Sequence, residues 1–240
     1  MEWRDEGLVI GLKRLGESSC VLEAMTRAHG RHLGLVRGAR SSRLAAALQP
    51  GNSVGLVWRA RLDEHLGAYA VEPLALRAGR FLPSALALAG VNLIGALLRL
   101  LPERDPHEAL FGMLMGVVEA LDDASEAPAL LARFEVRMLA EFGFALDLSQ
   151  CAATGARTEL IYVSPKSGRA VSASAGAAYR ERLLPLPAFL RDETATPSLD
   201  EIADAFRLTG FFLERELFGP RGLKLPAARE SLISAMRRGR

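Results

Sequence analysis

The chain has 240 residues, of which 50% are hydrophobic and 24% are charged. This composition excludes a disordered polymer and predicts a folded protein with one large core or two smaller ones. The net charge of +2 is too small to predict a polyanionic partner, so any electrostatic argument depends on where the charges lie.

The first residues, the longest apolar run and the two cysteines predict a cytoplasmic protein with no membrane contact. The first seven residues carry acids where a secretory signal needs a basic start followed by an apolar run. The longest apolar run, 81–101, contains Arg99 and other polar residues, so it predicts a buried helix in preference to a membrane span. Cys20 and Cys151 are far apart in sequence and imply no disulfide framework, which fits a reducing compartment.

The N-terminal third of the sequence predicts a small β-barrel. Short apolar runs are separated there by Gly, Asn and Asp, which is typical of strands joined by turns. The predicted strands are residues 7–13, 21–25, 54–58 and 66–71. A five-stranded barrel of the oligonucleotide/oligosaccharide-binding (OB) type fits this length, although periodicity alone does not distinguish it from other small β folds.

Helical patterns follow from residue 84 onward. The predicted helices are residues 84–101, 106–121, 128–142, 199–217 and 226–236. Between them, residues 151–174 are rich in Gly, Ser and Thr and predict an insertion on the helical part. Residues 81–150 carry four basic and ten acidic residues, whereas 1–80 carry twelve basic and eight acidic ones, so the two parts differ in electrostatic character.

An arginine segment without acidic residues lies in the predicted barrel. No acid occurs between Glu23 and Asp63, and arginines are spaced by three residues within 34–43. The intervening Gly and Ser leave donors free for phosphate oxygens, and guanidinium groups match phosphate geometry. The segment predicts a nucleic-acid contact, with a solvated basic loop as the alternative. The predicted contacts are Arg14, Arg27, Arg31, Arg37, Arg40, Arg43, Arg59 and Arg61.

Aromatic residues that could stack on unpaired bases are sparse in the predicted barrel. The candidates are Trp3, Trp58 and Tyr69. For each of them we expect a place in the core rather than a stacking platform, because large aromatic side chains dominate small cores.

Short motifs occur in a fixed order along the chain. They are Gly7-Leu-Val-Ile10, Arg14-Leu-Gly-Glu-Ser-Ser19, Leu35-Val-Arg-Gly-Ala-Arg40, Ser42-Arg43 and Leu48-Gln-Pro-Gly51. Together they resemble the N-terminal domain of the RecO family of recombination mediators. The resemblance continues at residues 133–135, 139–146, 151–155 and 162–169, and is weakest over 80–128. It therefore spans nearly the whole chain.

The resemblance implies an α+β fold and a role in DNA repair and recombination. Residues 1–80 would form an OB barrel, and residues 81–240 a helical domain with a zinc-finger-like insertion at 151–175. Such a protein binds single- and double-stranded DNA, anneals complementary strands and performs no catalysis. The resemblance also implies binding to RecR and to the acidic, apolar-tipped tail of the single-strand-binding protein, and hence an indirect part in loading RecA.

The insertion lacks the ligands of a zinc finger. The family resemblance implies two CxxC pairs, but residues 151–154 carry one cysteine, residues 172–175 carry none, and the segment has no histidine. Tetrahedral zinc needs four ligands, so we expect no metal and no cofactor. No nucleophile elbow, phosphate loop or metalloprotease motif occurs either, and we expect a protein that is not an enzyme.

Two arginines stand out in the acidic helical part. Arg133 and Arg137 are four residues apart and share a helix face. They predict a clamp for the carboxylates of a partner's tail, and the alternative pairs them with Glu135, Glu141 or other acids. For the whole chain, the alternatives to a recombination mediator are a generic RNA- or DNA-binding OB module and an enzyme with an unrecognised site.

Overall fold

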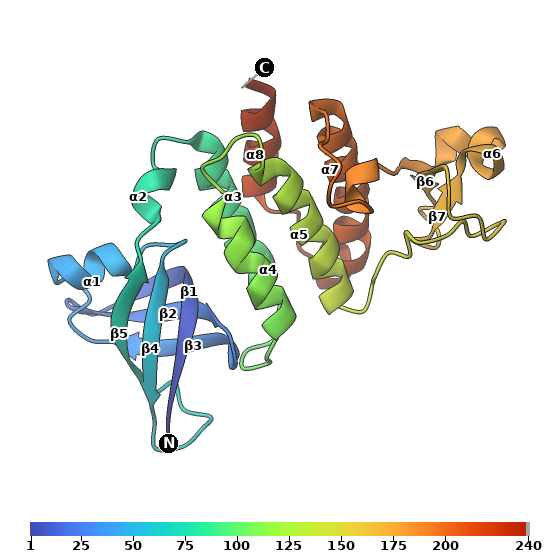
Figure 1. The fold of residues 1–240 in the computed structure, drawn as a ribbon. Coiled ribbons are helices and arrows are strands. Elements are labelled where there is room, and N and C mark those ends of the chain that lie inside the picture. The colour runs from blue at the N-terminus through green and yellow to red at the C-terminus, as the bar shows by residue number, and fades with distance from the viewer. Residues whose placement is uncertain (239–240) are drawn as a thin grey trace. The chain divides into compact units, whose positions relative to one another are not determined.

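A computed structural model describes residues 1–238 of the chain. It divides into two compact units, the first comprising residues 1–124 and the segment that begins at 228, the second residues 125–227. Together they give an α+β protein with an N-terminal sheet and a mainly helical remainder (Figure 1). This division does not coincide with the predicted domain boundary at residue 80. That boundary stays a prediction.

The first unit contains a five-stranded barrel and helices that follow it. The strands are β1 (Glu2–Leu15), β2 (Ser19–Thr26), β3 (Gly30–Val36), β4 (Ser53–Arg59) and β5 (Ala68–Ala75). The helices are α1 (Ser42–Ala47), α2 (Ala78–Phe81), α3 (Ala85–Leu98), α4 (Glu108–Glu119) and α8 (Ala227–Arg238). The Ser84 hydroxyl accepts a hydrogen bond from the Ala87 amide at 3.1 Å and caps α3.

The barrel closes because β1 is long enough to pair on both sides. Its strand order is β1-β2-β3-β5-β4, and β1 returns to β4. Residues 2–8 of β1 pair with β4 and residues 7–15 pair with β2, with an irregularity between Val9 and Gly11. Such an interruption bends a strand and increases its twist, which lets one strand serve two neighbours.

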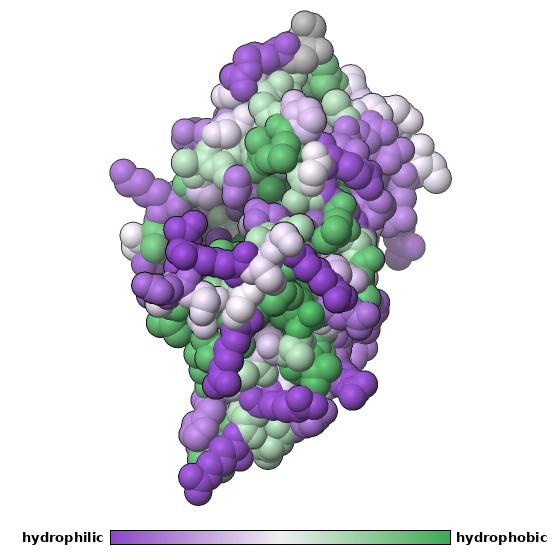
Figure 2. Space-filling model, turned by 90° about the vertical axis from the view of Figure 1, so that its left-hand side faces the viewer, coloured by the Kyte–Doolittle hydropathy of each residue, from purple (hydrophilic) through white to green (hydrophobic). Residues whose placement is uncertain are grey.

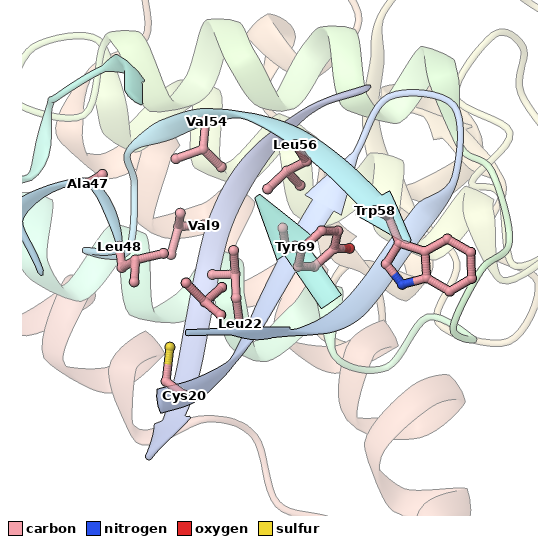
Figure 3. Close-up of a cluster of buried hydrophobic side chains, with 11 residues drawn as sticks. Val9, Cys20, Leu22, Ala47, Leu48, Val54, Leu56, Trp58 and Tyr69 are labelled. Atoms are coloured by element: carbon pink, nitrogen blue, oxygen red, sulfur yellow. The ribbon is translucent and has the colours of Figure 1, made fainter. Parts of the chain in front are cut away.

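The barrel encloses the main core of this unit. Val9, Leu22, Leu56 and Trp58 fill it, and Leu48, the residue after α1, adds to it at one end (Figure 3). All five are at most 2% exposed. The predicted core positions of Trp58 and Tyr69 are confirmed, since Tyr69 is also buried.

The structure contains a strand that the hydrophobic pattern did not predict. In β3 the buried positions are Gly30, His32, Gly34 and Val36, whereas its leucines are only half-buried. Gly34 has no room for a side chain because the Tyr69 ring occupies the space: a Cβ on Gly34 would lie 2.4 Å from its Cδ2. Glycine and histidine at the inward positions give no apolar pattern, so the sequence does not predict a strand at residues 30–36.

The burial of His32 predicts that the barrel is sensitive to acid. Burial, together with Arg104 and His29, lowers the pKa of His32 from 6.5 to about 4. Between these values the unfolded chain binds more protons than the folded chain, so stability should fall as the pH falls through this window. Urea unfolding across the window measures the effect. His32→Gln should reduce the slope of the unfolding free energy against pH. The control His65→Gln, at an exposed position, should leave that slope as in the wild type. Equal slopes for the two variants would contradict the role of His32.

The second unit combines helices with a small sheet. Its helices are α5 (Ala127–Glu141), α6 (Ala173–Gly176), α7 (Leu199–Phe212), a π-helical continuation η3 (Leu213–Phe218), and 3-10 segments η1 (Ala177–Arg182), η2 (Ala188–Leu190) and η4 (Gly219–Arg221). Strands β6 (Leu160–Val163), β7 (Ala170–Ser172) and β8 (Leu184–Pro185) form the order β7-β6-β8. The five long helices predicted from sequence are confirmed across the two units, with ends shifted by a few residues.

Candidate nucleic-acid interface

Four of the predicted arginines lie in or beside two adjoining connections at one end of the barrel, the β1–β2 turn and the segment from β3 through α1. Arg14 is the penultimate residue of β1, Arg37 and Arg40 lie between β3 and α1, and Arg43 lies in α1. We call these four residues the basic loop cluster. The strand register brings them together, because β2 lies between β1 and β3, and Cys20 of β2 is opposite both Arg14 and Val36.

A backbone hydrogen bond joins the two loops. The amide of Ala39 donates to the carbonyl of Ser18 at 2.8 Å. This bond holds the β1–β2 turn against the loop that carries Arg37 and Arg40. Figure 2 views the molecule from the side on which α1 lies in Figure 1, and hydrophilic side chains project from that face around hydrophobic patches.

The basic loop cluster retains its positive charge. Its four arginines are exposed, and none of them forms a salt bridge with another residue of the described range 1–238. Glu17, in the β1–β2 turn, is the acidic residue nearest in sequence to Arg14. Unpaired guanidinium groups on neighbouring loops can contact successive phosphates of one strand, which is the arrangement that nucleic-acid binding requires.

Two other predicted arginines pair with acids that lie far away in sequence. Arg27 pairs with Glu6, and Arg59 pairs with Glu2 at 2.9 Å. Although the arginine segment itself has no acidic residue, carboxylates of the neighbouring strand β1 lie beside it in space. These pairs involve exposed side chains and contribute little stability, but they reduce the charge available to phosphate.

Arg31 is held even more firmly in the protein. Its side chain is 14% exposed, and it donates to Glu23 at 2.8 Å and to the carbonyl of Leu101 at 3.0 Å. Glu103 lies 3.7 Å away. Arg31 thus joins the barrel to the segment after α3. Its side chain therefore has a structural role, whether or not it also contacts DNA.

Arg61 is separated from the basic loop cluster along the barrel. It is exposed and lies just after β4, whose last residue, Arg59, is opposite Glu2 at the start of β1. Arg14 lies near the other end of the 14-residue strand β1. The eight predicted contacts therefore divide into a cluster of four, three ion-paired arginines and one distant arginine.

The structure gathers histidines and aromatics that are scattered in the sequence. His29 stacks on Trp3 with ring centroids 4.0 Å apart, and its Nδ1 lies 2.9 Å from an Asp5 carboxylate oxygen. His32 Nδ1 lies 2.7 Å from the Tyr69 hydroxyl. Sequence reasoning missed this cluster because its members come from three strands and a turn.

Arg133 donates hydrogen bonds to backbone carbonyls in the second unit. Its Nε and Nη2 lie 3.1 and 3.0 Å from the Phe189 oxygen, and Nη2 also reaches the carbonyls of Asp192 and Glu193. The alternative to a tail clamp predicted that Arg133 pairs with Glu135 or Glu141, and neither carboxylate is among these contacts. Arg133 instead satisfies the carbonyls of the segment after η2.

Arg137 forms an ion pair with Glu141, one turn further along α5. This pair is the one that the alternative to a tail clamp predicted. The Nε of Arg137 is nevertheless buried without a hydrogen-bond partner among the described residues. This Nε is enclosed by protein, so an incoming carboxylate could contact only the exposed part of the Arg137 side chain, which is 41% exposed as a whole.

The segment with the zinc-finger likeness is held by hydrogen bonds. The amide of Ser172 donates to the Cys151 sulfur at 3.3 Å, and the amide of Ala175 donates to the Ser172 hydroxyl at 3.4 Å. Hydrogen bonds from the side chains of Ser172 and Thr154 lower the pKa of the Cys151 thiol to about 6. Cys151 is buried, with 1% of its surface exposed.

The side chains of Cys151, Thr154, Ser172 and Ala175 do not form a donor set that fits zinc. One sulfur, two hydroxyls and the methyl group of Ala175 stand where a tetrahedral site needs four ligands. Across residues 1–238, no three or more His, Cys, Asp or Glu side chains are grouped in a way that could hold a metal ion. Over the same range, none of the helices has the length and hydropathy that a membrane crossing requires.

Comparisons with known proteins cover nearly the whole chain. Residues 1–76 match the family model described as Recombination protein O N terminal, and residues 83–224 match Recombination protein O C terminal. The DNA repair protein RecO of Methylocella silvestris is 60% identical over 236 residues, which cover 98% of this chain and 95% of that protein. That of Beijerinckia indica subsp. indica is 59% identical, covering 98% and 94%, and that of Mesorhizobium japonicum 55%, covering 99% and 94%. The chain therefore belongs to the RecO family.

Proposed function

We propose that this protein is a DNA-binding recombination mediator in DNA repair. It would bind single- and double-stranded DNA, anneal complementary strands and help to load a recombinase onto DNA coated by single-strand-binding protein. Family membership supports the role in repair and recombination. The observation that carries the DNA contact is the basic loop cluster, whose four arginines are exposed and free of carboxylate partners within the described chain.

The barrel topology supports an OB-type assignment. OB folds are five-stranded barrels that bind oligonucleotides with strands 2 and 3 and with the loops joining strands 1 to 2 and 4 to 5. Here the barrel has five strands, and the β1–β2 turn lies beside Arg14. Of the basic loop cluster, Arg14 adjoins the β1–β2 turn, and the connection from β3 through α1 that carries the other three arginines is held to that turn by the Ala39–Ser18 hydrogen bond.

Annealing by such a surface requires charge neutralisation and no covalent chemistry. Arginines bound to two strands offset the repulsion between their phosphates, while contacts blind to sequence let the strands search for the paired register. We therefore propose a binding protein that is not an enzyme. Its two cysteines are free in the structure, which fits work in the reducing cytoplasm.

An annealing assay with the full chain tests this function directly. Two complementary oligonucleotides, one carrying a donor dye and the other an acceptor, are mixed at low salt with and without protein. We expect faster pairing with protein, and a binding affinity that falls linearly with salt on a double logarithmic plot. A protein that binds DNA without speeding pairing would be a generic OB module, and one that does neither would overturn the proposal.

We also propose that RecR and the acidic tail of single-strand-binding protein are partners, with RecA reached indirectly. The carboxylates of the tail would bind at Arg133 and Arg137, and the Arg137 side chain is 41% exposed. Because Arg133 is already engaged with three carbonyls, Arg137 is the sharper test of tail binding. A tail peptide should bind more weakly to Arg137→Ala than to the wild type, and equal affinity would remove Arg137 from the site.

The same two arginines differ in their expected effects on stability. Arg133→Ala should lower the free energy of unfolding by about 1–3 kcal/mol, because it leaves the buried Phe189 carbonyl without its donor. Arg137→Ala should lower it by about 1 kcal/mol or less, because it removes a single ion pair whose arginine side chain is 41% exposed. Chemical unfolding of both variants measures the difference. A larger loss for Arg137→Ala would contradict the assigned roles.

A further inference from the structure

A cavity of about 230 Å³ opens beside the basic loop cluster. The β1–β2 turn, the β3–α1 loop and α1 form its walls, and Arg14 and Arg40 are among the residues that line it. Pockets for drug-sized ligands occupy about 300–1,000 Å³, so this one suits a single small group such as one planar ring. Its position next to unpaired cations makes a part of a nucleic acid the first occupant to consider.

The floor of the cavity is apolar. Cys20 and Leu48 belong to the barrel core and are 3% and 2% exposed. Burial raises the pKa of the Cys20 thiol, so it stays neutral at physiological pH and behaves as a small hydrophobic group. The small side chains of Ala39 and Ala45 leave room above this floor. A flat apolar face can therefore enter the cavity and lose contact with water.

The polar part of the lining combines guanidinium donors with hydrogen-bond acceptors. Arg14 and Arg40 supply the donors, and Glu17 contributes a carboxylate. The Nε2 of Gln49 donates to the Ala45 carbonyl at 2.8 Å, which leaves its Oε1 available to accept. The edge of an unpaired base presents ring and amino N–H donors, and carboxylates accept from the amino group of cytosine. A base is uncharged, so Glu17 does not repel it inside the cavity.

We propose that this cavity receives one unpaired base of single-stranded DNA, while Arg14 and Arg40 bind the phosphates that flank it. The inference rests on the proposed function and adds to it a specific subsite and a ligand class. A paired base shields its Watson–Crick edge, so the subsite is open only to single strands. The phosphate contacts of Arg37 and Arg43, outside the cavity lining, are available to single strands and duplexes alike.

Fluorescence of 2-aminopurine tests the subsite with the full chain. This base is quenched when it stacks on its neighbours and brightens when it leaves the stack. A short mixed-sequence oligonucleotide with one such base near its centre is titrated with protein at low salt, next to the corresponding duplex. We expect brightening with the single strand on binding and none with the duplex.

Two neighbouring alanines of α1 provide a matched pair of variants. Ala45 lines the cavity, whereas Ala46 is exposed on the same helix and does not. Ala45→Phe should abolish the brightening and weaken single-strand binding by about 10-fold, as expected for the loss of one base contact, with duplex affinity unchanged. Ala46→Phe should behave like the wild type.

Glu17 provides a further variant that does not alter a buried position, because its side chain is exposed. Glu17→Ala should reduce any preference of the subsite for adenine and cytosine over thymine.

The outcomes separate the subsite from the proposed function. Salt-sensitive binding without brightening, or equal behaviour of the two phenylalanine variants, overturns the base subsite and leaves the DNA-binding function standing. An acidic peptide that competes for the cavity in the wild type but not in Ala45→Phe, with 2-aminopurine unchanged, would assign the cavity to a protein partner instead. A wild-type chain that binds no single strand at low salt overturns both.

Discussion

Replacing Arg37, Arg40 and Arg43 together by alanine should weaken single-stranded DNA binding by about 100-fold. The estimate takes roughly 1 kcal/mol for each lost phosphate contact. The three side chains are exposed and form no salt bridge within the described chain, so their removal leaves no buried group without a partner. Stability should change little. Fluorescence anisotropy with a labelled oligonucleotide measures the affinity.

The salt dependence of the same variant identifies the cause of the loss. Each phosphate contact on a single strand contributes about 0.7 to the slope of log affinity against log salt, so the slope should decrease by about 2. Arg27→Ala combined with Arg59→Ala is the control, because these arginines are exposed but already paired with Glu6 and Glu2. If the control loses as much affinity and slope as the triple variant, the basic loop cluster is not the principal contact.

Gly30→Ala should lower the free energy of unfolding by about 2–5 kcal/mol. Gly30 has a φ of +64°, a left-handed conformation that costs an ordinary residue about 1–2 kcal/mol. A Cβ at this position would also lie 1.9 Å from the Asp105 carbonyl oxygen, and relieving such an overlap costs about 1–3 kcal/mol more. Backbone must move, because the Arg104 amide donates to the Arg31 carbonyl at 2.8 Å beside it.

A second glycine separates the two contributions. Gly38 has a φ of +65°, but a Cβ on it would meet no atom within 4 Å. Gly38→Ala should therefore cost only about 1–2 kcal/mol. Urea unfolding of both variants gives the comparison, and equal losses would show that the close approach of residue 105 to the barrel has no energetic weight.

Much of the fold could be predicted from local sequence. The helices α3, α4, α5, α7 and α8 follow from apolar periodicity and from proline and serine at their starts, and these signals act within a few residues. Strand β3 could not be predicted, because its inward residues include polar His32 and also Gly34, which lacks a side chain where Tyr69, a residue 35 positions further along, packs. The family likeness was also visible in the sequence, since it depends on the order of motifs and not on contacts.

The candidate site shows the same division between local and non-local information. The positions of the positive charges, and the closeness of Arg37, Arg40 and Arg43, follow from the sequence, because a short segment keeps its neighbours near one another. The ion pairs of Arg27, Arg31 and Arg59, the place of Arg14 in the cluster and the cavity beside it arise only when the strands pair. Coulomb energy depends on distance in space, and strand register sets which carboxylates lie opposite which arginines.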